Sequence, residues 1–343
     1  MTSQRAKPLI HIGVIFCSAL LLPLLLSAAN AQSAPYSEAA DSRESLAWLG
    51  KVRAAALRLD YAGVFVYQQG PEVRTLRITH LGKTRPVREK LEMLDGQPRE
   101  CLRNGEEIIC YMPAERRLTA ESRGNEKAFP DFPAASPDQF APYYRVRKIG
   151  SARVAGRDAQ AIALEPIDGL RYGYRLWADK STGLLLRAQT ISEKGEVVEQ
   201  IAFTQLSIGS VASSRVKASF EDTHGWRIEN AVVRNLDLSR WVIKWVPGGF
   251  SQTRAVKRLV TDRPSDPAHA QKEITQILYS DGLAGISIFI EPWSPQKVGA
   301  PVHQGALNMV GKRHGEFWLT IVGEVPMAAI RQVADSIELT ATK

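Results

Sequence analysis

The chain has 343 residues, of which 44 are Lys or Arg and 36 are Asp or Glu, so its formal net charge is +8. This length suits two domains. The mild basic excess is compatible with an acidic partner or with anionic lipid headgroups. No compact Lys/Arg block interleaves with aromatic residues, so we do not expect nucleic acid as a partner.

Residues 1–31 have the features of a secretory signal peptide. Arg5 and Lys7 form a positive start, an apolar run extends from Leu9 to Leu26, and Ala29-Asn30-Ala31 is a cleavage signal. Removal of this segment leaves 42 basic and 36 acidic residues, a net charge of +6. A retained membrane anchor is the alternative, because the apolar run is long enough to cross a bilayer, although Pro23 interrupts it.

A helix over residues 42–59 is predicted to open the folded part. Its apolar side chains recur at steps of three and four residues, which is typical of an amphipathic helix; they are Leu46, Leu49, Val52, Ala56 and Leu59. Alternating side chains then predict strands over 61–69, 73–80 and 87–94. A helix followed by closely spaced strands favours an α+β fold.

Two cysteines remain after the signal segment, Cys101 and Cys110. A hairpin turning at Gly105-Glu106 would place them opposite each other, within the reach of a disulfide. A turn at Asn104-Gly105 would instead place Cys101 opposite Ile108. Export would supply the oxidising compartment that a disulfide needs, so we expect the pair to be bridged.

Regular periodicity stops between residues 111 and 144. Four prolines alternate there with aromatic residues, and a long irregular segment in a compact domain is often functional. We expect the aromatic side chains to cover the open side of a curved sheet; they include Phe129, Phe132, Phe140 and Tyr143. The alternative is a packed loop that binds no ligand.

Strands are predicted next over 145–153, 159–166, 171–178, 184–191 and 197–206, which together with the earlier strands form a broad antiparallel sheet. One helix cannot cover so many strands, so an apolar groove that accepts an acyl chain is expected. Its candidate lining is Phe65, Tyr67, Tyr172, Tyr174, Trp177 and Phe203. Tyr174 and Trp177 point to opposite faces of a regular strand, so all six cannot line one groove. The alternative is an ordinary packed core.

Periodicity is poor over residues 210–239, which we interpret as a linker between an N-terminal domain (42–209) and a smaller C-terminal α+β domain (240–341). In the second domain, strands are predicted over 241–246, 276–279, 285–290 and 314–322. A helix is predicted over 327–337, with Pro326 where a first helical turn tolerates proline.

No catalytic constellation is recognisable, so we do not expect an enzyme, and no cofactor is implied. The mature chain has five histidines, and none has metal-ligand spacing to another His or to a Cys; they are His80, His224, His269, His303 and His314. Asp168, Asp179 and Asp281 adjoin predicted turns, where Asp bonds its own backbone, so we interpret them as structural.

Several segments together resemble the RseB/MucB family of periplasmic regulators of the sigma-E envelope stress response. They are R-Y-G-Y-R-L-W-A-D, L-L-R and V-V-E-Q between residues 171 and 200, W-V-P-G-G-F at 245–250, Y-S-D-G-L at 279–283 and V-G-E-V-P at 322–326. The resemblance spans most of the chain, from about Leu46 to Ile337. The cysteine pair is not carried over from the family.

The resemblance implies an N-terminal half-barrel like the lipoprotein carriers of the LolA/LolB type. It also implies a negative regulator in the periplasm that binds the periplasmic part of an RseA/MucA-like anti-sigma factor and shields it from proteolysis. Lipid or lipopolysaccharide would release it. A periplasmic lipid or lipoprotein carrier is the alternative, although a carrier has no need of the second domain. A homo-oligomer remains possible.

Overall fold

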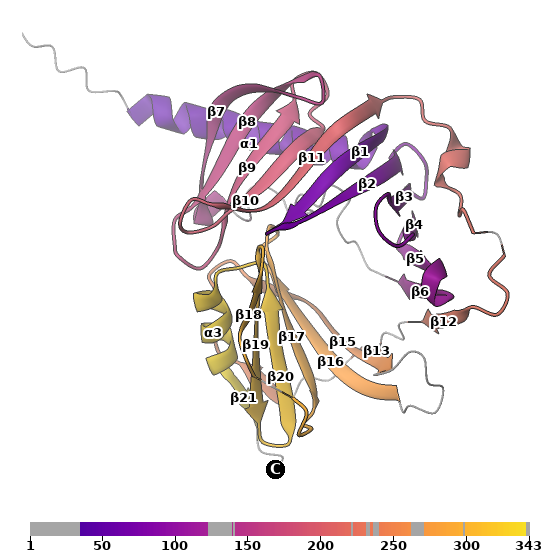
Figure 1. Cartoon of the computed structure of the whole chain (residues 1–343). Coiled ribbons are helices and arrows are strands. Elements are labelled where there is room, and N and C mark those ends of the chain that lie inside the picture. Colours follow the sequence, from indigo (N-terminus) through magenta and orange to yellow (C-terminus); the bar gives the residue numbers. More distant parts are fainter. Residues whose placement is uncertain are drawn as a thin grey trace, which may run out of the picture.

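The structure is a computed structural model that describes residues 35–122, 139, 141–220, 222–230, 234–235, 240–261, 271–297 and 299–340. The predicted signal peptide therefore lies outside the described residues, as do Phe129, Phe132 and Phe140. Figure 1 shows a large curved sheet with a long helix beside it, and a smaller sheet with a short helix below. Within the described ranges, no helix is both long and apolar enough to cross a membrane.

The larger sheet has twelve strands and is open, since its end strands do not pair with each other. All its neighbouring strands are antiparallel except the first pair, β12 and β6, which is parallel. The order is β12 (Arg227–Asn230), β6 (Arg117–Ser122), β5 (Glu107–Met112), β4 (Glu100–Asn104), β3 (Arg88–Met93), β2 (Glu72–Leu81), β1 (Asp60–Gln69), β11 (Val197–Ile208), β10 (Leu185–Ile191), β9 (Gly173–Asp179), β8 (Arg157–Pro166) and β7 (Tyr144–Val154). The predicted half-barrel is confirmed.

One long helix covers part of this sheet. Helix α1 (Pro35–Arg58) begins earlier than predicted and packs Leu49 and Val52 against strands β7 to β10. Ala55, one turn further along, belongs to a second apolar cluster built on β1, β2 and β11. The predicted apolar stripe is therefore the side of α1 that is buried. We call the sheet surface that α1 covers the inner face.

The smaller sheet has seven strands and carries helix α3 (Met327–Asp335) on one face. Its order is β13 (Arg234–Asn235), β15 (Ser251–Thr261), β16 (Gln271–Ser280), β17 (Gly285–Pro292), β20 (Phe317–Gly323), β19 (Leu307–His314) and β18 (Val302–Gln304). A separate two-stranded sheet pairs β14 (Trp241–Ile243) with β21 (Ile337–Leu339). The predictions missed β15, β18 and most of β19, and placed the start of β20 at His314 instead of Phe317.

Both sheets reach into the stretch that we interpreted as a linker. After a short 3-10 helix, η3 (Ser213–Val216), β12 joins the larger sheet and β13 joins the smaller one. The backbone N–H of Ser219 donates to Glu100, which also pairs with the buried Lys90 at 2.8 Å. The segment after β11 is thus bonded to the outer face of the larger sheet.

Cys101 and Cys110 lie directly opposite each other on β4 and β5 and form a disulfide. Asn104 pairs with Glu107, so the hairpin turns at Gly105-Glu106. Gly105 has a φ of +64°, which a glycine adopts without strain. The predicted bridge is confirmed, and the alternative turn at Asn104-Gly105 is not used.

Candidate functional site

Three of the six predicted groove aromatics meet on the inner face. The rings of Phe65 and Phe203 lie 5.8 Å apart, and both are almost fully buried. They belong to one apolar cluster with Tyr61 and Leu184. Tyr67 is half-buried at the edge of the same cluster. Two of the three therefore serve as core here, and Tyr67 is the one with accessible surface.

The other three aromatics do not join this Phe65 cluster. Tyr174 packs near Tyr144, with a ring separation of 6.2 Å, in the core beneath α1. Trp177 lies on the opposite face under the Arg187 guanidinium, 4.6 Å from the ring centre, as strand alternation requires. The Tyr172 hydroxyl accepts a 2.8 Å hydrogen bond from Asn308 of the smaller domain. Lipid binding by the six as a set stays a prediction.

The inner face continues beyond the reach of α1. Strand register places Leu91, Met93 and Ile108 on the same face as Phe65, together with the Cys101–Cys110 bridge. All are half-buried, and Leu91 and Met93 pack against the Phe65 cluster. Partly exposed apolar side chains thus form a row across β3 to β5 on this face. Sequence reasoning missed it, although counting registers outward from Phe65 could have found it.

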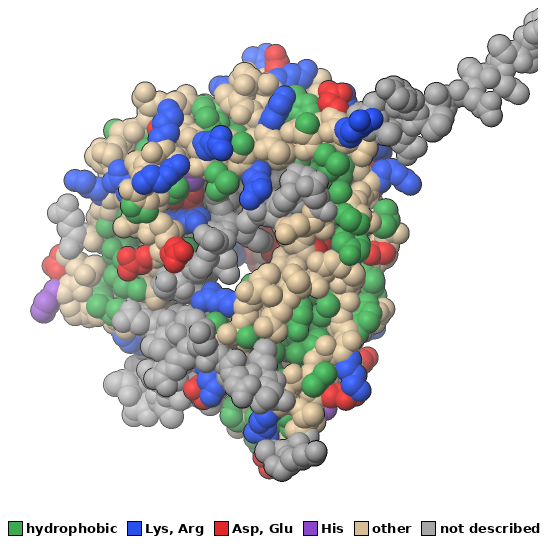
Figure 2. All heavy atoms as spheres, turned by 180° about the vertical axis from the view of Figure 1, so that it is seen from behind, with side chains coloured by type: hydrophobic (Ala, Val, Ile, Leu, Met, Phe, Trp, Pro, Cys, Tyr) green, Lys and Arg blue, Asp and Glu red, His purple; other side chains and the backbone are tan. Residues whose placement is uncertain are grey.

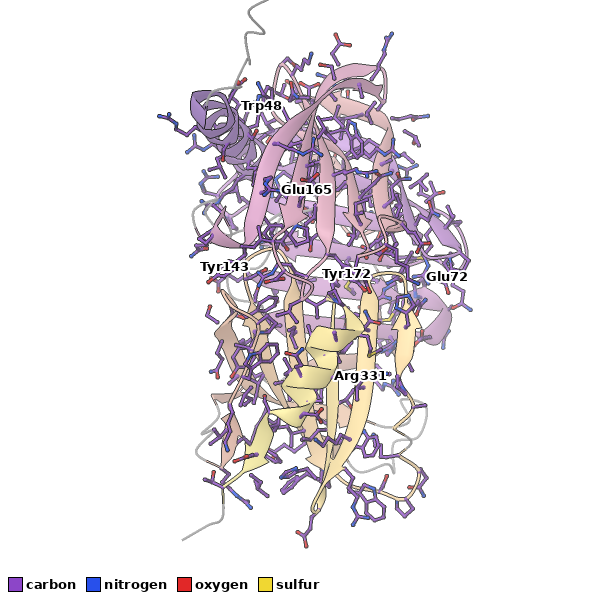
Figure 3. The ribbon with its side chains drawn as sticks, turned by 90° about the vertical axis from the view of Figure 1, so that its left-hand side faces the viewer. Trp48, Glu72, Tyr143, Glu165, Tyr172 and Arg331 are labelled. Atoms are coloured by element: carbon purple, nitrogen blue, oxygen red, sulfur yellow. A yellow bond between two sulfur atoms is a disulfide. The ribbon has the colours of Figure 1, made fainter. Side chains whose placement is uncertain are left out.

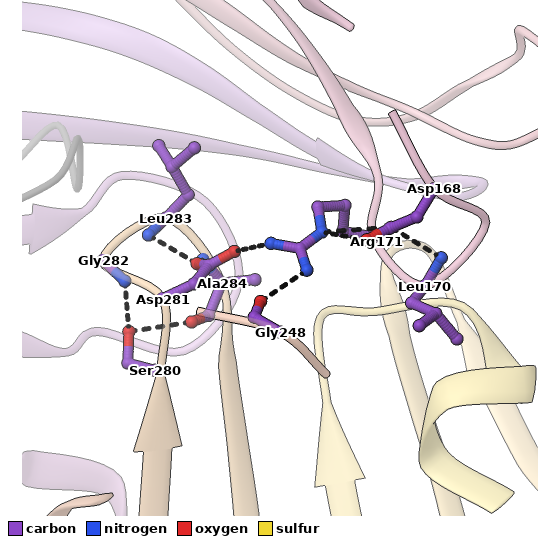
Figure 4. Close-up of polar contacts among 9 residues, drawn as sticks. All are labelled: Asp168, Leu170, Arg171, Gly248, Ser280, Asp281, Gly282, Leu283 and Ala284. Atoms are coloured by element: carbon purple, nitrogen blue, oxygen red, sulfur yellow. Dashed lines mark hydrogen bonds and ion pairs between the residues drawn. The ribbon is translucent and has the colours of Figure 1, made fainter. Parts of the chain in front are cut away.

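At the domain boundary, a fully buried arginine joins the two domains. Figure 4 shows Arg171, in the loop before β9, donating to Asp281 of the smaller domain at 2.9 Å and to the Gly248 carbonyl at 2.7 Å. Its Nε donates to Asp168 at 3.1 Å. Asp281 also accepts the backbone N–H groups of Leu283 and Ala284. Every charged group of this cluster therefore has a bonded partner.

Aromatic rings enclose this guanidinium. The ring centres of Tyr143, Phe250 and Tyr144 lie 4.7, 5.6 and 5.7 Å from its central carbon. Tyr143 also covers Gly249, where an added Cβ would come within 2.3 Å of its ring. The predicted groove-covering role of Tyr143 stays untested, but the structure places it at the domain boundary, as Figure 3 also shows.

Apolar side chains cross the same boundary in both directions. Leu283, from the smaller domain, belongs to the core cluster beneath α1, and Leu170, from the larger domain, packs on the core of the smaller one. Burial raises the pKa of Asp281, more than the N–H groups of Ala284 and Leu283 and the charge of Arg171 lower it. The two domains thus share a largely buried junction.

The aspartates that we interpreted as turn residues do bond their own turns. Asp168 accepts the Leu170 N–H at 3.0 Å, and Asp281 accepts those of Leu283 and Ala284 at 2.9 and 2.8 Å. Sequence reasoning missed that Arg171 then joins Asp168 to Asp281, because these aspartates lie more than one hundred positions apart. A single arginine beside a turn carries no signal of such a contact.

Family models match both parts of the chain. Residues 44–222 match the MucB/RseB N-terminal domain, and residues 235–338 match the MucB/RseB C-terminal domain. The sigma factor AlgU regulatory protein MucB of Pseudomonas aeruginosa is 32% identical over 92% of this chain and 96% of its own length. The sigma-E factor regulatory protein RseB of Escherichia coli is 26% identical over 96% of this chain and 98% of its own.

Solved structures agree with this comparison. A crystal structure of MucB in complex with MucA(peri) matches with a TM-score of 0.67 and 30% identity, covering 88% of this chain and all of that one. The complex of Pseudomonas aeruginosa MucA and MucB matches with a TM-score of 0.68 and 30% identity, covering 87% of this chain and all of that one. The likeness therefore extends over both domains.

Proposed function

Because this chain belongs to the MucB/RseB family, we propose that it binds the periplasmic region of a membrane anti-sigma factor of the MucA/RseA type in the periplasm. Bound there, it shields that region from regulated proteolysis until lipid or lipopolysaccharide releases it. The observation that carries the proposal is the match over both domains to MucB, which has been solved with MucA(peri).

Three features of the structure support this proposal. The half-exposed apolar row of Leu91, Met93 and Ile108 suits the acyl chain of a lipid signal. Over the larger domain, Lys and Arg side chains gather on the face seen in Figure 2, which favours an anionic headgroup. The buried Arg171 junction keeps both domains in one arrangement, so a partner that spans them meets a preformed surface.

Protection from cleavage tests the regulatory role directly. The periplasmic region of the anti-sigma factor is incubated with its initiating protease, with and without the purified mature chain. We expect the chain to slow cleavage in proportion to the bound fraction. Cleavage of an unrelated substrate of the same protease is the control and should be unchanged. A partner that binds but is cut at its free rate would refute shielding.

A lipid or lipoprotein carrier is the second candidate, because a carrier would also need the apolar row on the inner face. A pull-down from envelope extract separates the two functions. Recovery of the anti-sigma factor supports the regulator, whereas recovery of lipoproteins alone supports the carrier. The second family domain, joined through buried contacts, favours the regulator.

A further inference from the structure

A second stretch of the domain boundary is open to solvent. Three strand ends with their adjoining turns meet there: Gly70–Glu72 between β1 and β2, residues 196–198 at the start of β11, and residues 302–305 at β18. The Gly70 N–H donates to the Val198 carbonyl at 3.1 Å, and the Gln304 side chain donates to Glu72 at 3.2 Å across the boundary. Together they enclose a hollow of about 700 Å³, which we call the seam hollow, beside the labelled Glu72 of Figure 3.

Exposed aliphatic side chains surround the seam hollow. Val197 and Val302 line it with 42% and 46% of their surface exposed. Eight large hydrophobic residues of the described part are exposed to this degree, and two of them line this hollow. A group of exposed apolar side chains at one place indicates a binding surface, whereas single ones do not.

The lining of the seam hollow is acidic, although the chain as a whole is basic. Glu72 and Glu196 line it, and both are exposed. Among the described residues that form the lining there is no Lys or Arg. Arg74 pairs with Glu72 from two residues further along β2, and Lys194 lies in the turn that precedes Glu196. Aliphatic walls with carboxylates at their rim complement a segment that carries both aliphatic and basic side chains.

The free edge of the smaller sheet lies at the same place. β18 is the last strand in the order, and its residues Val302, His303 and Gln304 are all exposed. In the described part of the sheet its only neighbour is β19, so one edge of its backbone can pair with an added strand. An extended peptide can therefore gain backbone hydrogen bonds from β18 while its side chains enter the hollow.

We propose that the seam hollow docks an extended segment of the anti-sigma factor's periplasmic region, with aliphatic side chains against Val197 and Val302 and a Lys or Arg beside Glu196. This inference rests on the proposed function and names the surface that serves it. Since the hollow is built from both domains, a segment bound there contacts both and depends on their relative placement.

Binding of the purified periplasmic region of the anti-sigma factor to the full mature chain tests this docking site. We expect Val302→Glu and Glu196→Lys each to weaken binding at least tenfold, because the first buries a charge and the second repels the basic residue. Val242→Glu is the matched control, since Val242 is exposed to a similar degree, 41% against 46% for Val302, but lies on β14. It should bind as the unchanged chain does.

Ionic strength and crosslinking add two independent readouts. Wild-type affinity should fall as salt is added, and Glu196→Gln should reduce that dependence, because it removes one charge from the pairing. A photoreactive phenylalanine analogue at position 302 should crosslink to the partner, and one at position 242 should not. Unchanged unfolding temperatures would show that the variants are folded.

The outcomes separate this inference from the function on which it rests. If the unchanged chain does not bind the anti-sigma region at all, the proposed function fails. If it binds, but Val302→Glu and Glu196→Lys bind equally well and position 302 gives no crosslink, the seam hollow is not the docking site. In that second case the proposed function stands.

Discussion

Two stretches of one domain boundary differ in almost every physical respect. Around Arg171 the boundary is buried, every charged group is bonded, and a leucine from each domain packs against the core of the other. At the seam hollow the same two domains touch through the ends of β2, β11 and β18 and the turns beside them, and valines and carboxylates face solvent. The first stretch holds the domains together, and the second leaves a surface on which a partner can bind without breaking a contact.

The comparison also indicates how a ligand could act at a distance. A segment docked at the seam hollow would contact both domains, so its affinity would depend on their relative placement. The Arg171 junction fixes that placement. A lipid on the inner face would change partner affinity only if it binds the two arrangements with different affinity. Substitutions in the Arg171 junction and in the seam hollow, made separately, therefore distinguish the contacts that place the domains from the surface that binds the partner.

Arg171→Ala should have the largest effect on folding. It leaves Asp281 buried without its cationic partner, which typically costs about 3–5 kcal/mol. Urea unfolding followed by tryptophan fluorescence measures the loss. Arg313→Ala is the control, because Arg313 also lies over a ring, 3.8 Å from the Trp293 centre, but is exposed; its loss should stay near 1 kcal/mol or below. Equal losses of unfolding free energy in the two variants would show that the buried Arg171 contacts stabilise the fold no more than an exposed arginine over a ring does.

Gly249→Ala should cause the second largest loss of folding stability. The added Cβ would come within 2.3 Å of the Tyr143 ring, and the φ of +82° disfavours a side chain in any case. We expect a loss of about 2–3 kcal/mol, from strain and from displacement of Tyr143. Gly315→Ala has a φ of +60° and no neighbour within 4 Å, so it isolates the backbone cost at about 1 kcal/mol. A similar loss at both sites would argue against tight packing at the junction.

Acid should lower the folding stability of the larger domain through protonation of Asp179, and not through Asp281 at the Arg171 junction. Burial opposes ionisation of Asp179, but bonds from Ser181, Arg157 and Thr182 outweigh it and lower its pKa from 3.8 to about 2. Since the folded pKa is the lower one, Asp179 contributes about 2 kcal/mol above pH 4, and this is lost as pH falls toward 2. Asp281 has a raised pKa, so its protonation favours the folded state.

Unfolding curves between pH 2 and pH 7 test this contrast. Asp179→Asn should be less stable than the unchanged chain at pH 7, and the difference should shrink as pH approaches 2. Asp281→Asn should not remove the acid loss over the same range. If Asp179→Asn keeps the full acid dependence, another carboxylate is responsible.

Val302→Ala should have the smallest effect on folding. Its side chain is 46% exposed at the seam hollow, so we expect a change within about 0.5 kcal/mol. Leu283→Ala lies at the buried Arg171 junction, where Leu283 is only 7% exposed. It should lower the free energy of unfolding by about 2–4 kcal/mol, because it leaves a cavity. Guanidinium unfolding of both variants provides the measurement. A large loss for Val302→Ala would mean that the hollow is structural.

Local patterns predicted much of the fold. Alternation and turn residues placed the hairpins of the larger sheet, and the symmetry of Cys101 and Cys110 about their turn predicted the disulfide. β15 was missed, because Ser251–Thr261 mixes charged and apolar side chains without a clear period. Its pairing with β16 fixes its conformation, and such pairing is not visible in a single strand's sequence.

The candidate site was harder to predict than the fold. Strand parity separated Trp177 from Tyr174, but it could not show that Tyr172 bonds Asn308 of the other domain. The Arg171 cluster and the seam hollow both join residues that are far apart in the chain. These contacts follow from how the two domains meet, and no local pattern encodes that geometry.

The most direct test of the central claim is a titration of lipid into a complex of this chain with the periplasmic region of its anti-sigma factor. Partner affinity is measured at each lipid concentration by fluorescence anisotropy. We expect the apparent Kd for the partner to rise with lipid, and the partner to weaken lipid binding by the same factor, because coupling is reciprocal. A partner Kd that stays constant while lipid saturates the chain would contradict it.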